Sequence, residues 1–178
     1  MTRNTFFESR TAEGQVGHDE WLTPPSVLDL VRKVGIIGLD PFATKSPHDQ
    51  VKAKIKYQLP RSDGLKLTWK VPQGLTFANP PFMHLRVVSE KLLAEKLKGA
   101  EIILLAPIRA DTIWFKNAVE ASSAICFLPK RLRFLSPVSG QVEGTSMYPS
   151  GLFYIGKRLG TFHSAMKDAG WVVKTRWE

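Results

Sequence analysis

The stretch "LTFANPPFMH" (residues 75–84) joins an apolar run to an asparagine, two prolines and an aromatic residue. Residues 74–78 ("GLTFA") predict a buried strand. The prolines fix φ and offer carbonyl groups without N–H groups of their own, so the chain leaves this strand rigid and rich in acceptors. The segment is therefore either a stiff turn in which Asn79 caps the next helix, or a pocket for a planar nitrogen compound.

The acceptors of this segment suit an exocyclic amino group. Asn79 supplies a side-chain carbonyl beside backbone carbonyls, and two adjacent acceptors match the two hydrogens of an amine. Phe82 can stack on the attached ring. Hydrogen bonds from both hydrogens oppose delocalisation of the nitrogen lone pair, so the nitrogen becomes more nucleophilic without a strong base. The pattern predicts an amine-methylating site whose candidate catalytic residues are Asn79, Pro80, Pro81 and Phe82.

Outside this stretch, apolar runs alternate with segments of helical periodicity. The expected strands are residues 35–40, 74–78, 101–107, 124–128, 132–135, 151–156 and 171–175. The expected helices are residues 23–35, with Thr23 as the cap and Pro24 in the first turn, and residues 84–99, 109–121 and 161–169. Residues 43–64 and 136–150 are polar and are expected to be largely irregular.

This alternation indicates an α/β fold with a central sheet and helices on both faces. Ligands of such sheets bind outside the carboxyl ends of the strands, where Asp40, Asn79 and Pro107 are all expected. The chain has 178 residues, enough for one domain with a substantial core. We expect a flexible N-terminal arm over residues 1–18 and a single domain over residues 19–178.

The charge of the chain indicates a polyanionic partner. It has 25 Lys and Arg residues against 16 Asp and Glu residues, for a net charge of +9. A domain this basic can bind nucleic acid through phosphate contacts and counterion release. No apolar run is long enough to span a membrane, and the N-terminus lacks the apolar core of a signal peptide. The single cysteine, Cys126, is expected in the core, and an intracellular location is the simplest interpretation.

Several short motifs follow one another along the chain: "DEWLTP" (19–24), "LDPFAT" (39–44), "SDGL" (62–65), "FANPPF" (77–82), "LLAPIRADTIWF" (104–115), "KRLRF" (130–134) and "PSGLFYIG" (149–156). Their order and combination resemble the phage-type DNA N6-adenine methyltransferases, a small Dam-like family. "NPPF" is typical of amino-methyltransferases in general, whereas "WLTP" and "RADTIWF" narrow the resemblance to this branch. The resemblance covers residues 19–156.

The resemblance implies a Rossmann-like class I methyltransferase fold, with a mostly parallel central sheet and S-adenosylmethionine as cofactor. Asp40 would accept hydrogen bonds from the cofactor ammonium group, and Asp63 would accept the amino group of its adenine. Thr23 would offer donors to its carboxylate. The implied cofactor-binding residues are Trp21, Thr23, Pro24, Asp40, Pro41, Phe42 and Asp63. No metal is expected, and Asp49 is a candidate for contact with the ribose.

The implied substrate is double-stranded DNA with a flipped adenine, because a stacked base cannot reach a recessed pocket. The candidate substrate- or DNA-binding residues are Arg109, Asp111, Trp114, Lys130, Arg131 and Arg133. Arg131 and Arg133 fall on one face of a strand, where they either hold phosphates or protect an exposed edge. Lys157 and Arg158 are further basic candidates, and the loop 136–149 is a candidate for target selection.

Other functions remain open on the sequence. The protein could instead methylate cytosine N4, an exocyclic amino group that needs the same activation as adenine N6. A catalytically inactive, methyltransferase-like DNA-binding protein is a second alternative, because Ala43 and Thr44 stand where many related enzymes have a glycine-rich turn. A small-molecule amine methyltransferase is disfavoured by the positive charge. If the protein methylates adenine N6 in DNA, we expect it to be a monomer, with a dimer as the alternative. We expect it to act in the cytoplasm of a bacterium that carries the phage or prophage.

Overall fold

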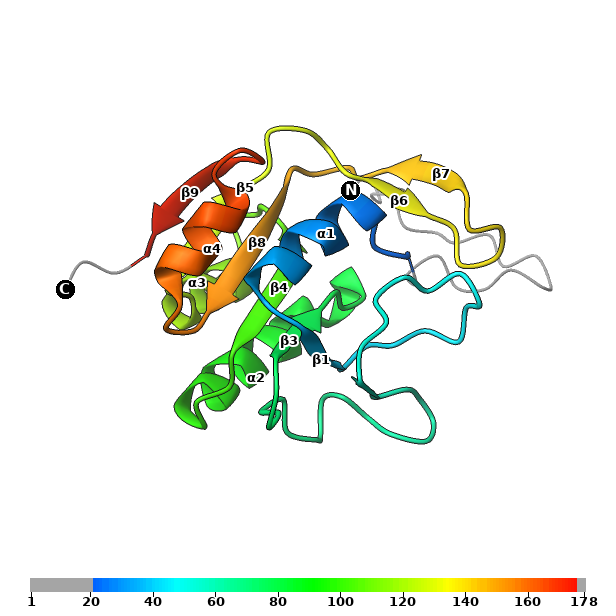
Figure 1. Ribbon diagram of the computed structural model, residues 1–178, viewed down its shortest axis with the longest axis horizontal. Helices are drawn as coiled ribbons and strands as arrows, with labels where there is room; N and C mark the ends of the chain where they lie inside the picture. The colour runs from blue at the N-terminus through cyan, green and yellow to red at the C-terminus, as the bar shows by residue number, and fades with distance from the viewer. Residues whose placement is uncertain (1–20, 176–178) are drawn as a thin grey trace, which may run out of the picture.

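The computed structural model describes residues 21–175 of the chain. The predicted flexible arm (residues 1–18) lies outside this range, as do the first two residues of "DEWLTP". The described helices are α1 (Pro25–Val34), the 3-10 turn η1 (Phe82–His84), α2 (Leu85–Leu97), α3 (Ile113–Ala121) and α4 (Leu159–Met166). The described strands are β1 (Ile37–Asp40), β2 (Ile55–Lys56), β3 (Leu75–Ala78), β4 (Ile102–Pro107), β5 (Ala124–Phe127), β6 (Arg133–Leu135), β7 (Val142–Thr145), β8 (Ser150–Ile155) and β9 (Trp171–Lys174). The predicted α/β class is confirmed (Figure 1).

Seven strands form the central sheet in the order β2-β1-β3-β4-β8-β5-β9. The pairings β2–β1, β1–β3 and β3–β4 are parallel. The pairings β4–β8, β8–β5 and β5–β9 are antiparallel. The sheet is therefore mixed, and the predicted parallel arrangement holds only for the half from β2 to β4. The other half differs because β8 runs back between β4 and β5, and antiparallel neighbours need no crossover helix.

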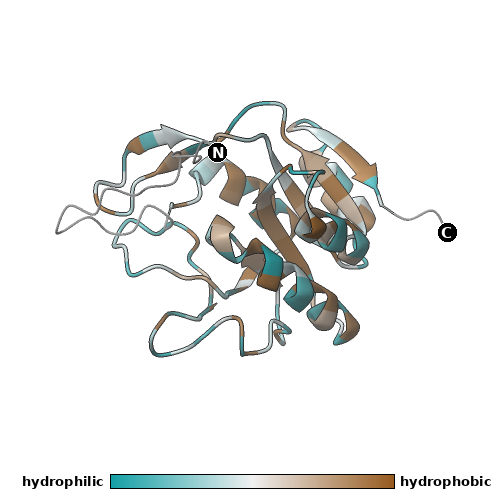
Figure 2. Ribbon diagram, turned by 180° about the vertical axis from the view of Figure 1, so that it is seen from behind, coloured by the Kyte–Doolittle hydropathy of each residue, from teal (hydrophilic) through white to brown (hydrophobic). Residues whose placement is uncertain are grey.

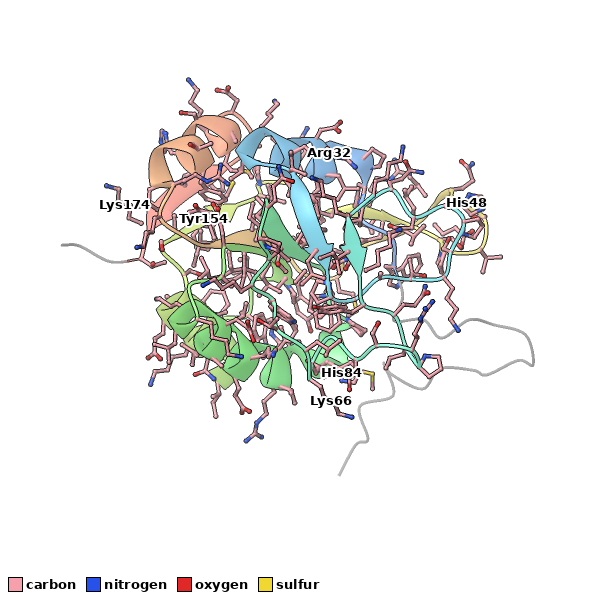
Figure 3. All side chains as sticks on the ribbon, turned by 60° about the horizontal axis from the view of Figure 1, so that its bottom comes forward. Arg32, His48, Lys66, His84, Tyr154 and Lys174 are labelled. Atoms are coloured by element: carbon pink, nitrogen blue, oxygen red, sulfur yellow. The ribbon has the colours of Figure 1, made fainter. Side chains whose placement is uncertain are left out.

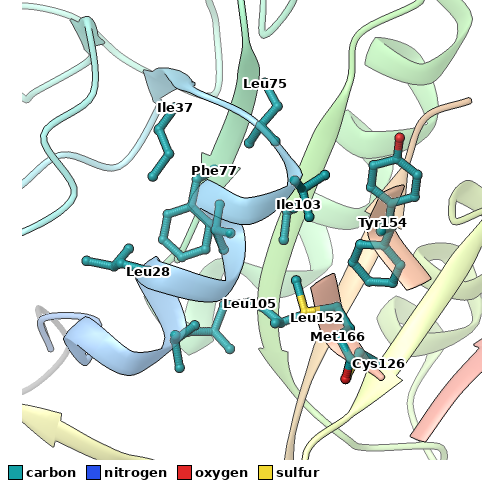
Figure 4. Packing of buried hydrophobic residues seen from close by; sticks show 14 of the residues in the cluster. Leu28, Ile37, Leu75, Phe77, Ile103, Leu105, Cys126, Leu152, Tyr154 and Met166 are labelled. Atoms are coloured by element: carbon teal, nitrogen blue, oxygen red, sulfur yellow. The ribbon is translucent and has the colours of Figure 1, made fainter. Parts of the chain in front are cut away.

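The helices cover both faces of the sheet, as predicted. On one face α1 and α4 pack over a cluster that includes Leu28, Phe77, Ile103 and Tyr154 (Figure 4). On the other face α2 and α3 pack over a cluster that includes Leu104. Neighbouring residues of a strand point to opposite faces, so a central strand covered on both sides must be apolar throughout. Figure 2 shows this pattern, with hydrophobic colour concentrated in the central strands.

Cys126 lies in the cluster under α1 and α4 and is fully buried, as predicted for a core residue. Burial raises the pKa of its thiol to about 11, because a thiolate would lose its hydration in this apolar surrounding. The thiol is therefore unsuited to act as a nucleophile at neutral pH.

Two local predictions are corrected by the structure. Helix α1 begins at Pro25 with Pro24 as its N-cap residue, and no side chain caps it, so Thr23 is not the cap. The segment 136–150, expected to be irregular, contains β7, which pairs with β6 in a second, two-stranded sheet. The sequence of β7 is "VEGT", which has no apolar alternation, and its conformation depends on the backbone of its partner. Within residues 21–175, no helix is long and apolar enough to cross a membrane.

Candidate active site

A pocket of about 440 Å³ opens at the carboxyl ends of β1 and β3. Asp40 is the last residue of β1 and Asn79 directly follows β3, and these two strands are parallel neighbours. Asp40 and Asn79, which are 39 positions apart in the sequence, therefore lie at the same edge of the sheet. The predicted catalytic and cofactor-binding residues that line the pocket are Trp21, Thr23, Asp40, Pro41, Phe42, Asp63, Asn79 and Pro81.

The side-chain amide of Asn79 has a defined orientation in this pocket. Its Nδ2 donates to the backbone carbonyl of Trp21 at 3.2 Å and to Oγ1 of Thr23 at 3.1 Å. The two amide hydrogens therefore have two acceptors. The Oδ1 atom of Asn79 is therefore the atom of this side chain that can accept a hydrogen bond from an amino group.

Asp40 is a buried carboxyl group, with only 5% of its surface exposed. Its Oδ1 accepts the backbone N–H of Phe42 at 2.9 Å. Burial raises the pKa of Asp40 to about 7, and the nearby negative charge of Asp49 acts in the same direction. The hydrogen bond from Phe42 and the charge of Lys56 oppose the rise without cancelling it. Among the described residues 21–175, no Lys or Arg side chain forms an ion pair with this carboxyl group.

Asp63 lies against the turn that follows Asp40. Its Oδ1 accepts the backbone N–H of Leu65 at 2.9 Å, and its Oδ2 lies 3.4 Å from Nζ of Lys66. The following residue, Gly64, packs on the carbonyl of Pro41, so the motif "SDGL" and the motif "LDPFAT" form adjacent walls. The indole N–H of Trp69 also donates to the carbonyl of Gly64 at 2.7 Å and fixes this contact.

Three of the predicted catalytic and cofactor-binding residues do not line the pocket. Pro24 is the N-cap residue of α1, and Pro80, the residue after Asn79 in the chain, is buried. Phe82 begins η1 and is 41% exposed, so its ring is accessible from outside the pocket. The candidate ribose ligand Asp49 does line the pocket, but its Oδ2 is paired with Nζ of Lys56 at 2.7 Å and its Oδ1 accepts the N–H of Val51.

The sequence analysis did not predict much of the pocket lining. The missed lining residues include Thr44, Lys45, Tyr57, Gln58, Leu59, Ser62 and His84. Most of them come from the polar stretch 43–64. Backbone hydrogen bonds between Tyr57 and both Asp40 (2.9 Å) and Ala43 (3.1 Å) carry this stretch to the end of β1. A strand of two residues such as β2 leaves no periodic signal by which the sequence could have revealed this pairing.

Arg109, Asp111 and Trp114 lie beyond the end of β4 and outside the pocket. Arg109 forms a two-point ion pair with Asp111, with distances of 3.0 and 2.9 Å, and its guanidinium lies 4.6 Å from the ring centre of Tyr148. Trp114 packs against the cluster under α2 and α3 and meets the ring of Phe115 edge-on at 5.9 Å. The guanidinium of Arg109 is therefore held in place by two neighbours on the surface beside the pocket.

Lys130, Arg131 and Arg133 are exposed and lie in or next to β6. We call residues 130–145 the basic hairpin. Exposure alternates as predicted, since Arg131 and Arg133 are exposed, Leu132 is half-buried and Phe134 is buried, but β6 begins at Arg133, so Arg131 precedes the strand. The hairpin adjoins the pocket, since Leu22 and Leu135 exchange two backbone hydrogen bonds of 3.0 and 3.1 Å.

Lys157 and Arg158 lie at the opposite edge of the sheet, because β8 is antiparallel and its last residue, Ile155, pairs with Ile102 at the start of β4. Arg158 is exposed but engaged within the chain: it forms an ion pair with Glu101 at 2.9 Å and donates to the carbonyl of Val34 at 2.9 Å. The proposed phosphate contact by these two residues therefore does not fit their position. Lys174 lies at the same edge, and Figure 3 shows it at the far side of the molecule from His48.

The residues of the described part offer no group of three or more His, Cys, Asp or Glu side chains that could hold a metal ion. The model of one protein family, described as DNA N-6-adenine-methyltransferase (Dam), matches residues 9–159 of the chain. The matched range includes the whole lining of the pocket and the basic hairpin. Among curated proteins, none matches the chain significantly.

Proposed function

The chain belongs to the Dam family of DNA N6-adenine methyltransferases, and we propose that it methylates adenine at the pocket beside Asn79 with S-adenosylmethionine as the methyl donor. The family match establishes the class of reaction, the methylation of adenine N6 in DNA. The proposal adds the cofactor, the residues of the site and a Rossmann-like class I arrangement. The single observation that carries it is the orientation of the Asn79 amide at the end of β3.

The pocket fits the proposed cofactor in size and in chemistry. Its volume of about 440 Å³ lies within the range of about 300–1,000 Å³ that is typical of sites for small molecules. Asp40 offers a carboxylate for an ammonium group, and Asp63 offers a second acceptor on an adjacent wall. The cofactor supplies a methyl group activated by a neighbouring positive sulfur. The chain supplies the binding groups Trp21, Thr23, Asp40, Pro41, Phe42 and Asp63, and Pro24, the N-cap residue of α1, holds the preceding Thr23 in place.

The target amine is activated by acceptors rather than by a base. Oδ1 of Asn79 accepts one hydrogen of the amino group and a backbone carbonyl of the Pro80–Pro81 segment accepts the other, while the two prolines keep the segment rigid. Phe82, exposed at the start of η1, stacks on the adenine ring. These contacts keep the nitrogen lone pair out of the ring and directed at the methyl group. Preorganised acceptors of this kind lower the barrier because they need no rearrangement during the reaction.

The proposed DNA surface is the carboxyl edge of the sheet. Arg131 and Arg133 of the basic hairpin, with Lys130, hold backbone phosphates of a duplex while the adenine is flipped toward Asn79. Arg109, braced by Asp111 and Tyr148, lies at the same edge, and Trp114 supports the helix behind it.

The test is transfer of a labelled methyl group from S-adenosylmethionine to unmethylated duplex DNA, followed by nucleoside analysis. We expect the label in N6-methyladenine. Label in N4-methylcytosine would keep the mechanism but contradict the proposed base. Measurable binding of cofactor and DNA without any label would contradict catalysis by this pocket.

A further inference from the structure

We infer that Thr23 is a positioning residue which, together with the backbone carbonyl of Trp21, sets the orientation of the catalytic amide of Asn79. This inference rests on the proposed function, because it assumes that Oδ1 of Asn79 receives the target amine. Thr23 would then influence methyl transfer through Asn79, in addition to any contact with the cofactor.

The carbonyl of Trp21 decides which end of the amide faces the chain. A carbonyl oxygen can only accept, so the amide must present its NH₂ group to it, at the observed 3.2 Å. The hydroxyl of Thr23 could serve either end of the amide, but here it lies 3.1 Å from Nδ2 and takes the second hydrogen. A rotation of the amide by 180° would lose the hydrogen bond to the Trp21 carbonyl and set two oxygen atoms against each other, and the Thr23 hydroxyl would have to turn and donate to Oδ1 instead.

Burial strengthens this arrangement. Thr23 is only 3% exposed, so little water is available to replace its hydroxyl as an acceptor. The hydroxyl makes no capping bond to α1, whose N-cap residue is Pro24 and whose end has no side-chain cap. A buried hydroxyl close to a helix start usually serves the helix. Here its described partner is Asn79, 56 positions along the chain.

The segment 21–23 is itself held from its other side. Leu22 forms two backbone hydrogen bonds with Leu135 of β6, and the ring of Trp21 packs over Gly144 of β7. The acceptors for Asn79 are thus fixed between the amide and the basic hairpin. The same contacts explain why asparagine suits position 79 better than aspartate, because a carboxylate would offer the Trp21 carbonyl no hydrogen.

The experiment compares Thr23→Val with Thr23→Ser, which remove and keep the hydroxyl. Three quantities are measured for each variant: the single-turnover rate of methyl transfer, the cofactor dissociation constant, and the exchange of the Asn79 side-chain NH₂ hydrogens with water by heteronuclear NMR. The NH₂ signals are identified by their loss in Asn79→Ala. The unfolding temperature is recorded for each variant, so that the rates are compared between folded proteins.

We expect Thr23→Val to slow transfer on the order of ten-fold, the size of one lost hydrogen bond, and to speed the exchange of the Asn79 hydrogens. Thr23→Ser, which keeps the hydroxyl, should show the transfer rate and the NH₂ exchange rate of the unsubstituted protein. In both variants, any change in the cofactor dissociation constant should be smaller than the roughly ten-fold change in transfer rate expected for Thr23→Val. A loss of cofactor affinity that accounts for the whole rate effect would overturn the inference, as would unchanged NH₂ exchange in Thr23→Val. Absence of transfer in the unsubstituted protein would instead count against the proposed function, while the NMR comparison would still decide the role of Thr23.

Discussion

Gly64 lies against the backbone carbonyl of Pro41 so closely that a Cβ atom at position 64 would come within 1.9 Å of that oxygen. The contact joins two segments that are separated along the chain, the turn after β1 and the loop that carries Asp63. Because the obstacle is a backbone atom, it cannot move aside as a flexible side chain would. Glycine at this position thus lets the two walls of the pocket meet.

Gly64→Ala is therefore expected to separate these walls. Overpacking against backbone costs about 1–3 kcal/mol of stability, and the displaced Asp63 should weaken cofactor binding. Calorimetry of cofactor binding and the unfolding temperature measure the two effects. Gly160→Ala is the matched control, because a Cβ there meets nothing within 4 Å. Equal behaviour of the two variants would show that the Pro41 contact has no role.

Asn79→Ala should abolish methyl transfer and leave cofactor affinity within about two-fold, because the amide faces the amine rather than the cofactor in the proposed mechanism. Transfer of labelled methyl and calorimetry separate the two quantities. Asn117→Ala is the control, since Asn117 also donates a side-chain hydrogen bond, to Ser89 between α3 and α2, but lies outside the pocket. An Asn79→Ala enzyme with normal turnover would refute the amine-activating role.

Asp40 should make cofactor binding depend on pH. Its pKa is raised by burial to about 7, so the carboxylate that attracts an ammonium group is lost as the pH falls through 7. The cofactor dissociation constant should therefore rise between pH 8 and pH 6. Asp40→Asn should bind weakly at both pH values and lose this dependence. A flat profile in the unsubstituted protein would remove Asp40 from the cofactor site.

The same shift predicts the opposite effect on the stability of the ligand-free protein. The folded pKa lies above the ordinary value of 3.8, so the folded state binds the proton more tightly, and stability is lost as the pH rises from about 4 to 7. Asp40→Asn should therefore raise the unfolding temperature at pH 8, while cofactor binding falls. Such a trade of stability for function is common at binding sites. Destabilisation by this substitution would contradict the buried, unpaired state of Asp40.

Replacement of Arg131 and Arg133 together by Gln should weaken DNA binding and flatten its dependence on salt. Two lost phosphate contacts reduce the slope of log K against log salt concentration by roughly 2. Lys157→Gln with Lys174→Gln removes the same charge from the opposite edge of the sheet and serves as the control. Fluorescence anisotropy over a range of salt concentrations gives both slopes. Equal slopes for the two double variants would assign the effect to net charge alone.

Glu95 should contribute to stability against acid. Burial tends to raise the pKa of its carboxyl group, but hydrogen bonds from Lys91, Lys98 and the N–H of Trp69 together outweigh burial and lower the pKa to about 2. The folded pKa lies below the ordinary 4.5, so this stabilisation is complete above pH 4.5 and is lost between pH 4.5 and 2.

Glu95→Gln should therefore lower the free energy of unfolding by about 2–3 kcal/mol at pH 7, because the two lysines and the Trp69 N–H lose a charged acceptor. The difference from the unsubstituted protein should shrink below pH 4.5. Denaturant unfolding at several pH values measures it. Glu120→Gln on the surface of α3 is the control and should change stability by less than about 0.5 kcal/mol. A pH-independent difference would show that the charge of Glu95 is not the cause.

The sequence by itself determined most of the helices and strands. Strands β3 and β4 are buried along their whole length and are apolar except for Thr76, because they are covered on both faces, so their pattern could be read directly. The placement of Asp40 and Asn79 at strand ends followed from the same patterns, together with the rule that ligands gather at that edge. The motif "NPPF" predicted an amine-methylating site, and the match to the DNA N6-adenine methyltransferase family establishes that class of reaction.

Only the tertiary structure decided which segments meet. The direction of β8, the pairing of β7 and the course of residues 43–64 depend on hydrogen bonds to backbone that lies far away in the sequence, and such bonds leave no trace in side-chain periodicity. Thr23 is the clearest example of a contact that the sequence alone could not predict. Its place before a helix predicted a cap, but its hydroxyl lies against Asn79, because the fold of the sheet brings that acceptor and that amide together.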